Sequence, residues 1–530
     1  MTKGKNKKTS DSAKRVLSEW WDDAVNLVLD LHFPFLKLAK ELGKRGYAII
    51  HDKPRVMTRE ELYRAGLRML ESGDRSIVAV NTVGREDSLN VFIEPGHMSE
   101  KEYYEQLYRI VQGNHHGVGR HLSVLRYMDL GDVNKCEEAI SLLIYGGDIE
   151  IFDAPIQIEF LIRDDQEVLL GFAEERELSH GIGLTNEGLA DALNKWIASK
   201  VKTISVPGST GHGAGRSVPA RFGKKNLTEM AEHIRKRRDE LNRELPEGRK
   251  KVINPDSLIN AVALLDRMGI EDLFDATAKA FDSFKHWYPN LYDEEQSNYC
   301  YKSLAKLVNN DLFRGRKPTL LDCGCAHGLG ANVLSGEGIE YWGVDASPEL
   351  IEIAKSRSSS KSFIVGDIVR VLLDREARAG DGRRLPRRFD VIACQGNTFD
   401  FFLGEPQKWF MLALFRSRLN RDGILFLTQR SFRPEEPKVE RKLPLGNEGH
   451  IVYDLEWQGN FANLSVEVGG RRLGSVIQHP TNPAWLQAAC EGLGFTRLTE
   501  MEHLLPDWFR PHGAEHPHDI YIFQLQGKQG

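Results

Sequence analysis

The stretch PTLLDCGCAHGLGANVL (318–334) decides the fold of the C-terminal half of this 530-residue chain. It begins with an apolar strand over 319–321, reaches an acid at Asp322, and opens into a turn containing Gly324, Gly328 and Gly330. Glycine is needed where a ligand approaches the backbone closely or where φ is positive. A helix follows the turn. By itself, such a strand–turn–helix unit fits several classes of nucleotide-binding enzyme.

Two further predicted strands end in acids. EYWGVDAS (340–347) ends in Asp345, about 20 residues after the Gly-rich turn, where an acid accepts hydrogen bonds from the ribose hydroxyls of an adenosine group. SFIVGDI (362–368) ends in Asp367, well placed for an adenine amino group. The intervening segment 348–357 reads as a helix with Pro348 in its first turn. Alternation of strands and helices predicts an α/β domain with a parallel sheet.

The remaining C-terminal segments extend this pattern. RFDVIACQGNTFDFF (388–402) is a fourth strand, and DGILFLTQRSF (422–432) is a fifth, after a helix over 407–419. Three segments between 450 and 480 predict an antiparallel insertion, and 485–500 predicts a helix, a glycine and a strand. The last strand is expected over 519–526.

Acids at three successive strand ends make residues 276–527 resemble the class I S-adenosylmethionine-dependent methyltransferases. A dehydrogenase would favour GxGxxG, whereas this motif reads Asp-x-Gly-x-Ala-x-Gly with Ala326 in the middle. The resemblance implies S-adenosyl-L-methionine as cofactor and a Rossmann-like domain with a seven-stranded sheet. It implies cofactor contacts at Asp322, Gly324, Ala326, Gly328, Asp345, Ala346, Asp367, Ile368 and Gln395.

The ends of two predicted strands resemble one subgroup of these methyltransferases. FDVIACQGNTFDF and DGILFLTQRSF are similar to the corresponding segments of glycine and sarcosine N-methyltransferases. The similarity implies that Asn397 and Arg430 hold the carboxylate of an amino-acid acceptor, and arginine binds carboxylates bidentately. Ser431-Phe432 replaces the Asn-Tyr-Asp of that family, so we expect a carboxylate-bearing or polar small amine rather than glycine itself. A surface salt bridge is the alternative for Arg430.

Other side chains are weaker candidates. In the family, the segment before the first strand closes over the cofactor, often through tyrosines, which makes Tyr292 a candidate catalytic residue here, although packing would equally explain it. His327 would either contact a ligand or lie exposed in its loop. His512, His516 and His518 resemble a metal cluster, but neighbouring prolines favour a rim loop, so we expect no metal. The remaining candidates are Tyr288, Gln296, Tyr299, Tyr453, Trp457 and His479.

The N-terminal half is expected to comprise a tail and helix (1–45), a smaller α/β accessory domain (46–200) and a helical linker (201–275). IEFLIRDDQEVLLGFAEE (158–175) resembles the strand pair of phospholipase D-like domains that carries HxKxxxxD. Asp165 retains the acid, but Ile158 and Phe160 stand where the His and Lys belong. The resemblance therefore implies a degenerate domain without a nucleophile, kept for binding, dimerisation or regulation.

Composition excludes several classes of protein. The chain has 71 Lys and Arg against 76 Asp and Glu, and its net charge of -5 argues against a nucleic-acid partner held by global positive charge. Six cysteines are too few for a disulfide scaffold. No apolar run approaches the roughly 20 residues of a membrane span, and the basic N-terminal segment resembles a solubilising tail more than a signal peptide. We therefore expect a cytoplasmic enzyme without membrane association.

The leading hypothesis is methyl transfer to the nitrogen of a small molecule, achieved by positioning. O-methylation is an alternative and would need a general base near the acceptor oxygen. Methylation of a macromolecule recruited by residues 46–200, or a cofactor-sensing regulator without turnover, are further alternatives. The sequence leaves open whether the protein is a homo-oligomer.

Overall fold

The computed structural model describes most of the chain between residue 55 and residue 526. The described ranges are 55–73, 75–81, 98–115, 117–118, 122–130, 149–152, 158–174, 177–185, 224–246, 273–283, 285–287, 301–313, 315–358, 362–430, 438–444, 450–458, 461–499 and 518–526, with a few single positions between 133 and 195. The predictions for residues 1–45, for 206–223 and for the segment containing His512 and His516 lie outside these residues.

The C-terminal half is built on a seven-stranded sheet in the order β10-β9-β8-β11-β12-β18-β17. The five strands from β10 to β12 are parallel, and β18 runs antiparallel to both of its neighbours. The strands are β8 (Thr319–Cys323), β9 (Glu340–Asp345), β10 (Phe363–Val365), β11 (Phe389–Cys394), β12 (Leu419–Arg430), β17 (Phe495–Arg497) and β18 (His518–Leu525). The predicted Rossmann-like seven-stranded domain is confirmed.

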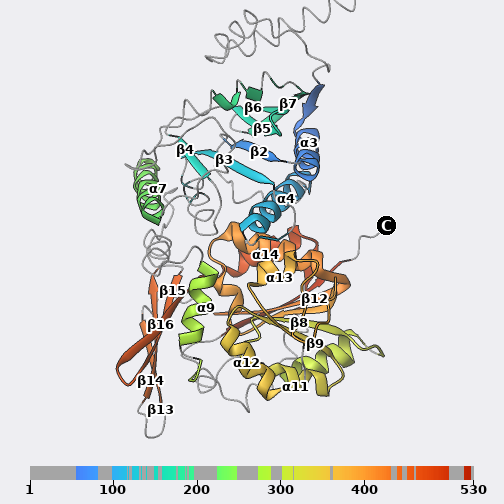
Figure 1. The fold of residues 1–530 in the computed structure, drawn as a ribbon, viewed down its shortest axis with the longest axis vertical. Coiled ribbons are helices and arrows are strands. Elements are labelled where there is room, and N and C mark those ends of the chain that lie inside the picture. The colour runs from blue at the N-terminus through green and yellow to red at the C-terminus, as the bar shows by residue number, and fades with distance from the viewer. Residues whose placement is uncertain are drawn as a thin grey trace, which may run out of the picture.

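Helices cover both faces of this sheet (Figure 1). They are α11 (Leu329–Gly336), α12 (Pro348–Arg357), α13 (Ile368–Leu373), α14 (Glu405–Arg418) and α15 (Pro483–Gly492). Successive strand residues point to opposite faces, so Leu320 packs in the core with α11 and α12, whereas Leu321 packs with α13, α14 and α15. Every residue of β11 and all but the first residue of β8 are buried, as expected for parallel strands that helices cover on both faces.

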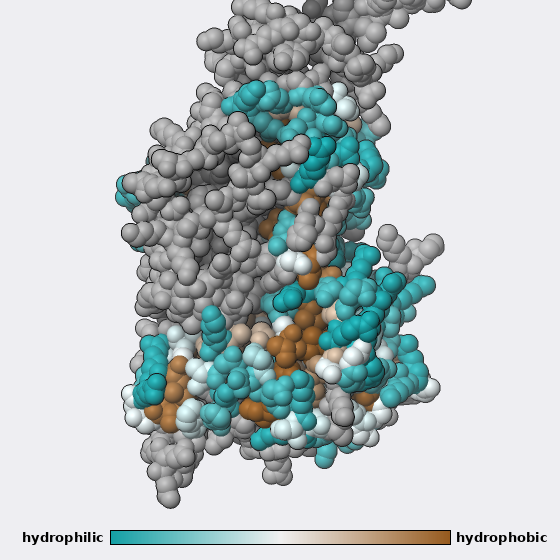
Figure 2. Space-filling view, viewed as in Figure 1, coloured by the Kyte–Doolittle hydropathy of each residue, from teal (hydrophilic) through white to brown (hydrophobic). Residues whose placement is uncertain are grey.

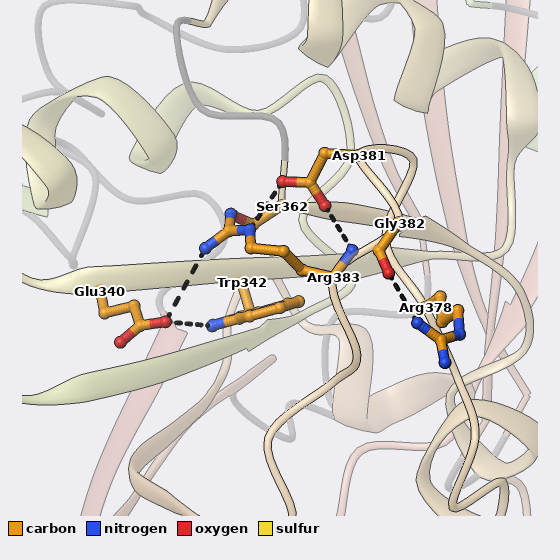
Figure 3. Close-up of polar contacts among 7 residues, drawn as sticks. All are labelled: Glu340, Trp342, Ser362, Arg378, Asp381, Gly382 and Arg383. Carbon is orange, nitrogen blue, oxygen red and sulfur yellow. Dashed lines mark hydrogen bonds and ion pairs between the residues drawn. The ribbon is translucent and has the colours of Figure 1, made fainter.

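The arginine-rich loop between α13 and β11 is held against the strands at one edge of the sheet (Figure 3). The Arg383 guanidinium lies 4.8 Å from the centre of the Trp342 ring and donates to Asp381 over 2.7 Å. It also donates to Ser362 and lies 3.9 Å from a Glu340 oxygen. These contacts hold the loop against β9 and against Ser362, the residue before β10. The charge of Arg383 is therefore engaged in contacts within the fold.

The N-terminal half contains a second seven-stranded sheet, in the order β1-β7-β6-β5-β2-β3-β4. Its strands are β1 (Arg55–Thr58), β2 (Ser76–Asn81), β3 (Ser123–Asp129), β4 (Ile149–Phe152), β5 (Ile158–Arg163), β6 (Glu167–Glu174) and β7 (Glu177–Thr185). The predicted hairpin between β5 and β6 is confirmed, and Asp164 and Asp165 turn it with φ of 51° and 59°. The sequence reading missed β1, β7 and α3 (Arg59–Ser72).

The helix α4 (Met98–His115) joins the two halves (Figure 1). The Tyr108 ring stacks on Phe410 of α14, with ring centres 5.7 Å apart, and Lys101 Nζ donates to the Gly492 carbonyl at the end of α15 over 3.5 Å. Tyr108 belongs to the same buried cluster as α13 and α14. The N-terminal half therefore docks on the helical layer of the C-terminal domain. Helix α7 (Lys224–Glu244) lies within the segment 201–275 that was expected to be a helical linker.

The antiparallel insertion was predicted as three strands and is a four-stranded sheet. Its strands are β13 (Lys438–Pro444), which the sequence reading missed, β14 (His450–Gln458), β15 (Phe461–Val468) and β16 (Arg471–Gln478). Helix α9 (Leu273–Ser283) lies against β16, and Ser283 Oγ donates to the Leu473 carbonyl over 2.8 Å. Figure 1 shows α9 between this small sheet and the large one. In the described part of the chain, no helix has both the length and the apolar character to cross a membrane.

Candidate active site

Asp322 lies at the carboxyl end of β8 and is 1% exposed. Its Oδ2 accepts a hydrogen bond from the Tyr341 hydroxyl over 2.9 Å, while its Oδ1 is buried and has no hydrogen-bond partner among the described residues. Burial raises the pKa of Asp322 to about 7, more than the Tyr341 hydrogen bond lowers it. A buried carboxylate oxygen without a partner is costly and fits a site that a donor completes.

The turn after β8 is forced into left-handed backbone conformations. Gly324, Ala326 and Gly328 have φ of 77°, 47° and 74°. A Cβ at Gly324 would lie 2.2 Å from Thr398 Oγ1, so glycine is required there for packing as well as for φ. Ala326 takes the same region without being glycine, which stores strain beside the predicted cofactor site.

Asp345 ends β9, and two backbone N–H groups hold its carboxylate. Its Oδ2 accepts from Ala326 N over 2.8 Å, and its Oδ1 accepts from Ser347 N over 2.9 Å. Burial nevertheless raises the pKa of Asp345 to about 6, with a smaller contribution from the nearby Asp282. The predicted residue Ala346 lies between these contacts and is half-buried.

The third strand differs from its prediction. β10 ends at Val365 and not at Asp367, because Asp367 is the N-cap of α13 and its Oδ1 accepts from Arg370 N over 2.9 Å. Ile368 is the first residue of α13 and is buried in the core. The sequence reading missed Val365, which is 46% exposed and pairs in register with Asp345. An exposed apolar side chain beside a polar strand end suits the face of an aromatic base.

The turn after β11 contributes two predicted residues. Gln395 is 8% exposed, and its Nε2 is buried with no hydrogen-bond partner among the described residues. Asn397 is buried in a left-handed conformation with φ of 63°, and its N–H donates to Thr428 Oγ1 over 3.5 Å. Since β11 adjoins β8 in the sheet, Gln395 and Asp322 belong to the same carboxyl edge.

Arg430 is the last residue of β12 and is 3% exposed, so it is not a surface residue. Its backbone N–H donates to Asp400 Oδ2 over 2.8 Å, and its Nε donates to Gln478 Oε1 over 3.0 Å. Burial raises the pKa of Asp400 to about 6 and lowers the pKa of Lys408 to about 8. The attraction between the two charges acts against both shifts without cancelling them. The sequence reading missed Asp400, although it lies in the quoted segment 389–401, and it missed Lys408 and Gln478, which lie outside the quoted motifs.

The remaining candidates divide into two groups. His327 is 3% exposed, and burial lowers its pKa to about 4, so it is not an exposed loop histidine. His479 Nδ1 accepts from Gly404 N over 3.2 Å, which gives His479 a structural contact. The side chains of the other candidates lie outside the described residues, namely Tyr288, Tyr292, Gln296, Tyr299, Tyr453, Trp457, His512, His516 and His518.

Residues 321–427 match the family model of the methyltransferase domain. The C-terminal half carries a methyltransferase domain. This match supports S-adenosylmethionine as the cofactor of the domain. The family does not extend to residues 46–200, and the comparisons give no support to the phospholipase D-like hypothesis.

Three curated relatives are N-methyltransferases. The chain is 32% identical over 136 residues to the glycine/sarcosine/dimethylglycine N-methyltransferase of Actinopolyspora halophila, which covers 25% of this chain and 22% of that protein. It is 30% identical over 117 residues to the glycine/sarcosine N-methyltransferase of Aphanothece halophytica, and this alignment covers 21% of this chain and 40% of that protein. It is 25% identical over 171 residues to the glycine/sarcosine N-methyltransferase of Halorhodospira halochloris. That alignment covers 32% of this chain and 59% of that protein. The chain thus spans less than two thirds of each relative.

Two of the solved structures to which the chain is similar are methyltransferases. One, from Clostridium acetobutylicum, is 14% identical, aligns over 47% of this chain and 99% of that one, and has a TM-score of 0.35. The other is CalS10, an amino pentose methyltransferase from Micromonospora echinaspora, with 13% identity, coverage of 46% and 96%, and a TM-score of 0.33.

The residues at the carboxyl edge fit the implied cofactor. The methionyl part of S-adenosylmethionine carries an ammonium donor and a carboxylate acceptor. Asp322 Oδ1 is a buried acceptor without a partner, and Gln395 Nε2 is a buried donor without one, among the described residues. The ribose carries two hydroxyl donors, and Asp345 presents a carboxylate fixed by backbone N–H groups. The edge therefore offers a complementary group for the methionyl ammonium, for the methionyl carboxylate and for the ribose hydroxyls.

Proposed function

We propose that this protein transfers a methyl group from S-adenosylmethionine to the amine nitrogen of a small molecule that bears a carboxylate. The observation that carries the acceptor part of the proposal is the buried Arg430 guanidinium, at the same edge of the sheet as Asp322 and Asp345. The N-methyltransferase relatives add support, since they align with part of this chain at 25–32% identity.

On the cofactor side, three residues each bind a different part of S-adenosylmethionine. Asp345 accepts hydrogen bonds from the ribose hydroxyls, because backbone N–H groups hold its carboxylate in one orientation. Asp322 accepts from the methionyl ammonium, whose charge offsets the cost of ionising a buried acid. Gln395 donates to the methionyl carboxylate. When bound, S-adenosylmethionine supplies a methyl group already activated by its sulfonium.

On the acceptor side, Arg430 binds the carboxylate and Asn397 donates to it or to the amine. An arginine suits this role because its planar guanidinium engages a carboxylate bidentately. The neutral amine needs only in-line placement, and positioning of this kind lowers a barrier by ~7–11 kcal/mol. The chain's contribution is therefore orientation, and the proposal requires no general base.

The test uses the full-length protein, S-adenosylmethionine and a panel of small amines, with mass spectrometry for the gain of one methyl group. Arg430→Lys retains a positive charge but loses the planar fork. We expect cofactor affinity in calorimetry to remain within about threefold, while kcat/KM for a carboxylate-bearing amine falls ~10- to 100-fold. Unchanged acceptor kinetics would remove the carboxylate assignment, and products methylated on oxygen would favour the O-methyltransferase alternative.

A further inference from the structure

Arg430 is held by one residue of the four-stranded sheet. Gln478, the last residue of β16, is 2% exposed, and its Oε1 accepts from Arg430 Nε over 3.0 Å. This hydrogen bond restrains the rotation of the planar guanidinium at the end of β12.

The backbone of Arg430 is fixed as well. Asp400 Oδ2 accepts from Arg430 N over 2.8 Å, and the Asp400 carbonyl accepts from His479 N over 2.6 Å. Lys408 lies below this turn and donates from Nζ to the Phe399 carbonyl over 3.0 Å. Asp400 therefore ties the end of β12 to His479, the residue that follows Gln478.

Strand β16 also reaches the cofactor side through α9. Ser283 Oγ donates to the Leu473 carbonyl, and a Cβ at Gly474 would lie 2.8 Å from Ser283 Oγ, which shows how closely α9 and β16 approach. The neighbouring Asp282 accepts from Ser347 Oγ, two residues after Asp345. Strand β16 and helix α9 thus connect the end of β9, where we propose that ribose binds, with the Arg430 guanidinium.

We propose that Gln478 is a positioning residue that orients the Arg430 guanidinium and thereby sets the selectivity of the enzyme for acceptors with a carboxylate. This inference deepens the proposed function and rests on it. It assigns the four-stranded sheet a role in acceptor selection, carried by one hydrogen bond at the end of β16. The inference predicts that loss of this bond changes which acceptors are used, and not only how stable the protein is.

Gln429 provides a matched control. It is 1% exposed, precedes Arg430, and exchanges hydrogen bonds with Thr481: its Nε2 donates to the Thr481 carbonyl over 2.8 Å, and Thr481 N donates to its Oε1 over 3.3 Å. Gln429→Leu therefore removes hydrogen bonds between the end of β12 and the segment after β16, but it leaves the hydrogen bond between Gln478 and the Arg430 guanidinium in place. Gln478→Leu and Gln429→Leu remove the same amide from equally buried positions.

The experiment measures kcat/KM for a carboxylate-bearing amine, such as sarcosine, and for its amide, in wild type and both variants. We expect Gln478→Leu to reduce the ratio of acid to amide ~10- to 100-fold while cofactor affinity stays within about threefold. Gln478→Glu should reduce the ratio further, because its carboxylate competes for the guanidinium. Gln429→Leu should lower thermal stability but leave the ratio unchanged.

The outcomes separate the two proposals. If wild type shows no preference for any acid in the panel over its amide, the proposed function is wrong and this inference is wrong with it. If wild type shows the preference and Gln478→Leu retains it, only the positioning role is overturned. An equal loss of the ratio in Gln429→Leu would also overturn it, because the effect would then be structural.

Discussion

Asp345 Oδ2 accepts a hydrogen bond from the backbone N–H of Ala326 over 2.8 Å, which ties the end of β9 to the turn after β8. Ala326 adopts a φ of 47°, a region that non-glycine residues rarely occupy, and this bond is one of the contacts that holds it there. The acid therefore both shapes the Gly-rich turn and presents its remaining lone pairs at the carboxyl edge of the sheet. Structure and predicted ligand binding depend on the same carboxylate.

The first prediction concerns this acid. Asp345→Ala removes the ribose acceptor and the partner of two backbone N–H groups, so we expect S-adenosylmethionine affinity to fall at least ~100-fold in calorimetry. Asp191→Ala, at an exposed acid of the N-terminal half, should bind the cofactor as wild type does. Near-native affinity in the Asp345 variant would refute the ribose assignment.

The second prediction concerns stability and Asp322. The folded pKa is raised from 3.8 to about 7, so the unfolded chain ionises this acid first and wild-type stability falls as pH rises from about 4 to 7. Asp322→Asn keeps an acceptor for the Tyr341 hydroxyl and removes the ionisation. At about pH 8 we expect the cofactor-free variant to unfold with a free energy about 1–4 kcal/mol higher than wild type.

Thermal denaturation at several pH values measures this effect. The difference between variant and wild type should shrink toward about pH 4, where the acid is largely protonated in both states. An Asp322→Asn variant that is less stable than wild type throughout this range would show that the buried ionisable group is not a source of instability.

The third prediction concerns pH and cofactor binding. Asp322 and Asp345 accept hydrogen bonds from the ligand most strongly when ionised, and their folded pKa values are about 7 and about 6. We therefore expect affinity to fall as pH drops through 7 and then 6, by roughly tenfold or more between pH 8 and pH 5.5. Asp322→Asn should bind more weakly at pH 8 and show a smaller dependence. Constant wild-type affinity over this range would contradict both assignments.

The fourth prediction uses two glycines with similar backbones. Gly324 and Gly338 have φ of 77° and 84°, but a Cβ would meet Thr398 Oγ1 at 2.2 Å at the first position and nothing within 4 Å at the second. Gly338→Ala should therefore cost about 1 kcal/mol of unfolding free energy, and Gly324→Ala clearly more, with reduced cofactor binding. Equal costs in urea denaturation would show that the contact with Thr398 is relieved without consequence.

Much of the C-terminal fold could be predicted from the sequence. The strands around Asp322 and Asp345 are apolar runs bounded by acids and glycines, and these local signals are strong because a parallel strand is buried on both faces. The third strand was predicted to extend to Asp367 because that acid follows an apolar run, whereas the strand ends at Val365 and Asp367 caps the helix that follows. Short caps of this kind leave little trace in hydrophobic periodicity.

The sequence by itself determined which chemical groups reach the carboxyl edge, because strand ends and their acids are encoded locally. The tertiary structure alone decided the environment of those groups: Asp322 is left with an unpaired buried oxygen, Arg430 is buried, and Gln478 binds it from 48 positions further along the chain. The reason is physical. Burial, pKa and hydrogen-bond partnership depend on atoms brought together from distant segments, and no local pattern of residues encodes that proximity.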